Sequence, residues 1–120
     1  MPPRRPVLSS EPANRAHWQQ GGRLTLVCLV RGGQPTPRLT WALDGSEAEV
    51  VKLAGQRCPG QPAAPVLTIS TELSPPALLV SRLTSPCIPA SLAGANLACS
   101  ASNNNISRPT AAATWLSVHG

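Results

Sequence analysis

A chain of 120 residues has the size of one domain, and its core must be mainly aliphatic, because the sequence contains three Trp but no Phe and no Tyr. The formal net charge is +5, yet the Arg residues are scattered, which argues against nucleic-acid binding, a function that usually needs a concentrated basic stripe. No apolar run reaches the roughly 18 residues of a membrane span, and fourteen Pro and nine Gly exclude long helices.

The N-terminal residues 1–6 include two adjacent Arg residues that no long apolar run follows, so this segment lacks the pattern of a signal peptide. We expect it to be a disordered leader. Residues 7–120 are expected to form a single domain, since the sequence shows no internal repeat. If the domain is extracellular, it is a piece of a longer precursor.

Alternation of polar and apolar residues predicts two strong strands in the first half of the domain. Residues 23–30 and 38–44 alternate in this way, with the inward positions Leu24, Leu26, Cys28, Val30, Leu39, Trp41 and Leu43. Asp44 and Gly45 then supply a tight turn. The short strands and frequent turns predict an all-β domain.

The middle of the chain is predicted to hold three shorter strands and two irregular segments. Strands are expected at residues 50–53, 65–71 and 77–83. In the last of these, Leu78 and Val80 share a face. The irregular segments are residues 54–65 with Cys58 and residues 84–90 with Cys87.

Two further strands are predicted at residues 96–102, with Leu97, Cys99 and Ala101 inward, and at residues 111–118. A run of asparagines lies between these strands. Its last residue, Asn105, begins a sequon, an acceptor for N-glycosylation in a secreted protein.

The last strand suggests a binding residue. If Leu116 and its alternating neighbours face inward, Trp115 points outward, beside small residues of the adjacent strands such as Thr40 and Ala98. A large ring on a flat surface of small residues is a typical binding hot spot. Two alternatives remain open: the register is shifted by one residue, or Trp115 packs against a neighbouring domain.

Four cysteines stand far apart, and none belongs to a C-x-x-C pair or lies at ligand-like spacing from a histidine, which argues against a metal site. An even, widely spaced set is typical of disulfides that form in an oxidising compartment. The sequence also contains no pattern that indicates catalysis. The sequence has no G-x-S-x-G motif, no Gly-rich phosphate loop and only one aspartate, Asp44, so no catalytic residue and no cofactor is predicted.

Cys28, Trp41 thirteen positions later and Cys99 near the C-terminal end give the chain a resemblance to the immunoglobulin superfamily. The run Cys28–Gly45 is similar to the B strand, B–C loop and C strand of I-set or C2-set modules. The run Cys99–Asn104 is similar to the end of strand F, and Leu78-x-Val80-x-x-Leu83 to strand E. The resemblance covers nearly the whole chain.

The resemblance implies an immunoglobulin-like antiparallel β-sandwich with Greek-key topology. It implies a Cys28–Cys99 disulfide between the sheets and a core that includes Trp41, Leu26, Leu39 and Leu97. The chain departs from the family where Leu97 takes the place of the usual tyrosine and Ala93 that of the usual aspartate. With the first bridge assigned, the remaining pair implies a second disulfide, Cys58–Cys87; the alternative is that one or both of these cysteines is free or pairs with another chain.

The same resemblance implies an extracellular recognition module of a membrane-anchored cell-surface protein, which binds a protein partner, heterophilic or homophilic, in adhesion or immune signalling. Two other functions stay open: a structural spacer in a multi-domain ectodomain, and a basic module that binds acidic glycans such as heparan sulfate.

Overall fold

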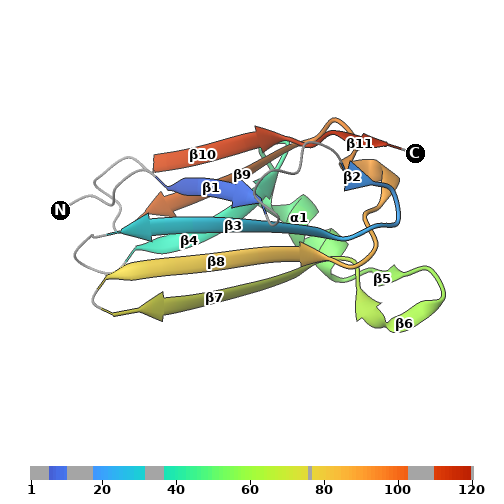
Figure 1. Ribbon diagram of the computed structural model, residues 1–120, viewed down its shortest axis with the longest axis horizontal. Helices are drawn as coiled ribbons and strands as arrows, with labels where there is room; N and C mark the ends of the chain where they lie inside the picture. Colours follow the sequence, from blue (N-terminus) through green and yellow to red (C-terminus); the bar gives the residue numbers. More distant parts are fainter. Residues whose placement is uncertain (1–5, 11–17, 32–36, 76, 103–109, 120) are drawn as a thin grey trace.

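Two antiparallel sheets packed face to face form the body of the molecule, which confirms the all-β sandwich (Figure 1). The computed structural model describes residues 6–10, 18–31, 37–75, 77–102 and 110–119. The four-stranded sheet has the order β1-β3-β8-β7, from Val7–Ser10, Leu24–Arg31, Leu78–Ser85 and Thr68–Ser74. The three-stranded sheet has the order β10-β9-β4, from Thr110–Trp115, Asn96–Ser102 and Arg38–Leu43.

Two small strand pairs and two short helices complete the described fold (Figure 1). β2 (Trp18–Gln19) pairs in parallel with β11 (Val118–His119), and β5 (Arg57–Cys58) forms a hairpin with β6 (Gln61–Pro65). The helices are α1 (Glu47–Ala54) and the 3₁₀ turn Ala90–Leu92. Among the described residues, neither helix has the length and apolar character needed to cross a membrane.

Inward side chains of the two sheets meet in an aliphatic core around Trp41, as the alternation predicts. Leu26, Trp41 and Leu97 are buried. Leu39 is only half-buried and packs at the margin of the core. The inward residues of β3, which are fully or almost fully buried, are Leu24, Leu26, Cys28 and Val30.

The predicted strand at residues 50–53 is wrong, because this segment lies in the helix α1. Ser46 caps the helix: its side-chain oxygen accepts a hydrogen bond from the backbone N–H of Glu49 at 3.3 Å. Val50 and Leu53, one turn apart, bury their side chains in the core. The sequence from Ser46 to Glu49 matches the S-x-x-E capping box, a helix signal that is independent of apolar alternation.

Boundaries in the middle of the chain also differ from the predicted ones. The strand expected at residues 65–71 is β7, displaced to Thr68–Ser74, because Val66 and Leu67 are buried in the connection before it. The expected loop at residues 54–65 contains the β5–β6 hairpin. Leu78 and Val80 do share a face of β8, but it is the half-exposed outer face.

The two ends of the domain also depart from the predicted pattern. The single strand expected at residues 111–118 is interrupted after Trp115, where Leu116 turns into the core, and it resumes as β11. Residues 1–5 of the expected leader lie outside the described residues, and Pro6 is buried next to β1.

Candidate binding face

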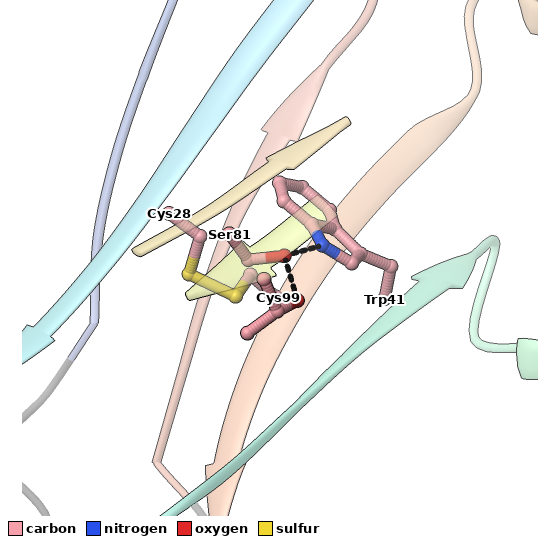
Figure 2. The surroundings of a disulfide bond; sticks show 5 residues. Cys28, Trp41, Ser81 and Cys99 are labelled. Atoms are coloured by element: carbon pink, nitrogen blue, oxygen red, sulfur yellow. Dashed lines mark hydrogen bonds between the residues drawn. A yellow bond between two sulfur atoms is a disulfide. The ribbon is translucent and has the colours of Figure 1, made fainter. Parts of the chain in front are cut away.

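The framework of the candidate site is the disulfide between Cys28 on β3 and Cys99 on β9, which joins the two sheets with a Cα–Cα distance of 6.5 Å. Both cysteines are fully buried. The indole Nε1–H of Trp41 donates a 2.8 Å hydrogen bond to the Oγ of Ser81, and Figure 2 shows this serine between the disulfide and the ring. The predicted bridge beside an indole is therefore confirmed, and it holds β9 in place at the centre of the three-stranded sheet.

A second disulfide joins Cys58 in the β5–β6 hairpin to Cys87 after β8, with a Cα–Cα distance of 5.9 Å. This bond confirms the second predicted pairing.

Beside the second disulfide lies an open cleft of about 610 Å³ that includes Arg57 and Gln56 in its lining. Arg23 lines a second cleft of about 350 Å³, together with Pro65 at the end of β6, and none of the described residues that line either cleft is acidic.

The cross-strand register places small side chains in rows on the outer face of the three-stranded sheet. Ala113, Ala98 and Ala42 face one another across β10, β9 and β4. The next row contains Ala111, Ser100 and Thr40. Since side chains on one face alternate, all of these residues point away from the core.

Trp115 stands at the end of this face, and 71% of its surface is exposed. It pairs with Asn96 across the strands, so Ala98 lies diagonally next to it. Thr40 lies on the same face but two strands away and nearer its other end. The structure therefore brings Trp115 and Ala98 together and leaves Thr40 apart.

The turn after β4 fixes the rim of the face beside Trp115. Asp44 and Gly45 have backbone φ angles of 49° and 83°, the two positive values that a two-residue type I′ turn requires. Asp44 makes two bonds to the backbone of Asn96: its N–H donates to the Asn96 carbonyl at 2.7 Å, and its Oδ1 accepts the Asn96 N–H at 2.9 Å. The Asp-Gly pair in the sequence indicated the turn, but not that its carboxylate fixes the strand beside Trp115.

Charges mark the two ends of this face. Asp44 follows the last residue of β4, and Arg38 is the first residue of the same strand; both are exposed. At about 3.4 Å per residue, they stand roughly 20 Å apart. A partner that covers the face would therefore meet an acidic group at the same end as the indole and a basic group at the far end.

Two other kinds of site, a glycosylation site and a metal site, were considered from the sequence. Asn105, the expected glycosylation site, lies outside the described residues. Within the described ranges, no group of three or more His, Cys, Asp or Glu residues is arranged to hold a metal ion.

Comparison with known proteins identifies related sequences and folds. A family model for CD80-like C2-set immunoglobulin domains matches residues 9–110. No curated protein matches the chain. The full ectodomain (Ig1–Ig3) of mouse nectin-like molecule 4 superposes with a TM-score of 0.62 and 19% identity, covering 98% of this chain and 34% of that one.

Two further solved structures show the same fold. Dpr2 Ig1-Ig2 in complex with DIP-Theta Ig1-Ig3 gives a TM-score of 0.62 at 18% identity, covering 98% of this chain and 32% of that one. Rst D1-D2 gives a TM-score of 0.58 at 14% identity, with coverage of 98% and 49%. The chain thus spans about a third to a half of the length of the solved chains that it resembles.

Proposed function

Because this chain belongs to the CD80-like C2-set immunoglobulin domains, we propose that it is an extracellular recognition module of a membrane-anchored cell-surface protein. It binds a protein partner through the outer face of β10, β9 and β4, centred on Trp115. The observation that carries the proposal is the indole of Trp115, exposed over 71% of its surface on a face of small residues. Two intramolecular disulfides support an oxidising, extracellular location.

The chemistry of the face suits recognition of another protein. The small side chains around Trp115 lose little or no rotamer entropy when a partner covers them. The ring itself offers a large apolar area with few rotatable bonds, which is why tryptophan is enriched at binding hot spots. The solved Dpr2 structure is a complex of immunoglobulin domains, which adds support for a protein partner.

An unbiased cell-surface interaction screen with the glycosylated domain tests the proposal, followed by affinity measurements on Trp115→Ala. We expect this variant to lose about 2 kcal/mol or more of binding energy, a weakening of roughly 30-fold or more. Val51 on α1 has the same 71% exposure but lies off the face, so Val51→Ala is the matched control and should bind normally. A folded Trp115→Ala variant that keeps full affinity would falsify the assignment of the face.

Binding of acidic glycans is a second candidate function, favoured by Arg57 and Arg23 in two clefts whose described lining residues include no acid. Exposed arginines attract sulfate groups, and added salt screens that attraction. Retention on heparin that falls steeply with salt and is weakened in an Arg23→Ala/Arg57→Ala variant would support this function. If the domain binds no protein in the screen and is not retained on heparin, a structural spacer is the remaining function.

A further inference from the structure

β7 forms one edge of the four-stranded sheet and, within the described part of the chain, pairs only with β8 (Figure 1). All seven residues of this strand, Thr68–Ser74, are exposed. An edge strand presents backbone N–H and C=O groups that its own sheet does not use, and these groups can pair with a strand of another molecule.

The usual protections of an edge strand are missing from β7. Its sequence, TISTELS, contains no Pro and no Lys. Its one charge, Glu72, forms an ion pair with Arg82 on β8 at 3.4 Å. Nothing in these side chains prevents a second strand from approaching.

Two apolar side chains of β7 lie on the side that faces the other sheet but are not covered by it. Ile69 pairs with Leu83 and Leu73 with Leu79, both of which point into the core. Ile69 is nevertheless 42% exposed and Leu73 54% exposed. The second sheet has three strands against four, so β7 lies beyond the strands that could cover it.

The strand is self-complementary about Thr71. If two copies of β7 pair antiparallel with Thr71 at the two-fold axis, Ile69 of each copy lies opposite Leu73 of the other. Cross-strand apolar pairs of this kind stabilise antiparallel sheets. The pairing brings each of these apolar side chains into contact with an apolar side chain of the other copy and so reduces the area that they expose to water.

The opposite side of the strand is also compatible with this pairing. In the same register, Glu72 of one copy lies opposite Ser70 of the other, and Ser70 is the cross-strand neighbour of Arg82. Because Ser70 is small, Arg82 can extend over it toward Glu72 of the second copy. The only acidic group on the edge therefore meets a positive charge.

We infer that β7 is a homodimerisation edge: a second copy of this chain adds its own β7 in antiparallel orientation, and two four-stranded sheets become one of eight strands. Such a contact is isologous, with the same residues on both sides. The strand contributes only seven residues from each copy, against roughly 20–30 residues a side in a standard interface, so the association is expected to be weak and reversible. The edge belongs to the sheet opposite the Trp115 face, and the inference does not depend on that face.

Sedimentation of the whole chain between about 10 μM and about 1 mM tests this inference. The natural chain should shift from monomer toward dimer as its concentration rises. Ile69→Lys and Leu73→Glu should each stay monomeric, because each places a charge opposite an apolar residue. An equimolar mixture of the two variants should form a heterodimer, because the introduced lysine of one then faces the introduced glutamate of the other.

Two further variants serve as controls. Val51→Lys alters an exposed apolar residue away from the edge, and Trp115→Ala alters the proposed binding face; both should dimerise like the natural chain. The inference is overturned by a natural chain that is monomeric at about 1 mM, by a dimer that survives Ile69→Lys, or by a mixture that stays monomeric. Dimerisation that is lost in Trp115→Ala would place the interface on the other sheet and would also overturn it.

Discussion

Ser81 ties three strands together through one buried hydroxyl group. Its Oγ accepts the indole N–H of Trp41 on β4 at 2.8 Å and bonds to the hydroxyl of Thr71 on β7 at 2.9 Å. A serine hydroxyl has one donor and two acceptor sites, so it can satisfy both partners. Ser81 also pairs in register with Cys28, which places this polar link beside the disulfide (Figure 2).

Replacing Ser81 should destabilise the domain, because the Trp41 N–H would remain buried without this acceptor. We expect Ser81→Ala to lower the free energy of unfolding by about 1–3 kcal/mol, measured by urea denaturation with tryptophan fluorescence. Thr71→Val keeps the shape of the side chain and leaves the Trp41–Ser81 hydrogen bond intact. Its free energy of unfolding should therefore fall by less than that of Ser81→Ala. Equal stability of Ser81→Ala and the natural chain would show that this hydrogen bond contributes nothing.

The sequence predicts the side of a sheet toward which a side chain points, but not how deeply that side chain is buried. The outward direction of Trp115 follows from its position between residues that turn toward the core, and the structure shows it exposed. Leu39 was predicted to be a core residue from the same alternation, yet it is only half-buried. Alternation fixes the side of a sheet on which a residue lies, but burial depends on what covers that side, which is a property of the tertiary structure.

At the scale of elements, the predictions succeeded where apolar alternation was strong. Strands β3, β4 and β9 match their predicted positions closely, because every second residue is buried or half-buried. β7 begins three residues later than predicted because Val66 and Leu67 are buried in the connection before it, and its own side chains, all exposed, carry no apolar alternation that marks its bounds. α1 was missed because two adjacent valines suggest a strand and eight residues show little of the helical period.

The helix cap offers a test at this scale. Ser46→Ala removes the side-chain acceptor for the Glu49 N–H and should cost about 1 kcal/mol of stability in chemical unfolding. Ser46→Asp restores an acceptor at the cap and should keep most of the stability. If both variants lose the same amount, the loss comes from the turn before α1 and not from the cap.

At the scale of the whole molecule, one disulfide joins the two sheets in the core and the other holds a hairpin at one end. Cys28–Cys99 closes a separation of 71 residues in the centre of the core, whereas Cys58–Cys87 closes one of 29 residues and holds the hairpin at one end. Both pairings were predictable because the resemblance assigned the first bridge and only two cysteines remained. The β5–β6 hairpin itself was not predictable from the sequence, because its two short, mostly exposed strands carry no apolar pattern.

Removal of the second bridge should loosen the end of the domain without unfolding it. A Cys58→Ser/Cys87→Ser variant is expected to lose about 3.5 kcal/mol of stability by the loop-entropy model. Hydrogen exchange of the Val66 amide, which donates to the Gln56 carbonyl at 2.9 Å, should become faster than exchange in β3 and β9. Unchanged protection at Val66 would mean that the bridge does not hold the hairpin in place.

The central bridge also limits how the domain responds to a pulling force. β1 and β11 lie toward opposite ends of the long axis, so tension applied at these strands runs along the sandwich (Figure 1). With Cys28 and Cys99 joined, the chain between them is bypassed. Only roughly forty residues could then unravel, which limits the extension to about 140 Å at about 3.5 Å per residue. Cys58 and Cys87 both lie inside the bypassed segment, so the second bond bears no load.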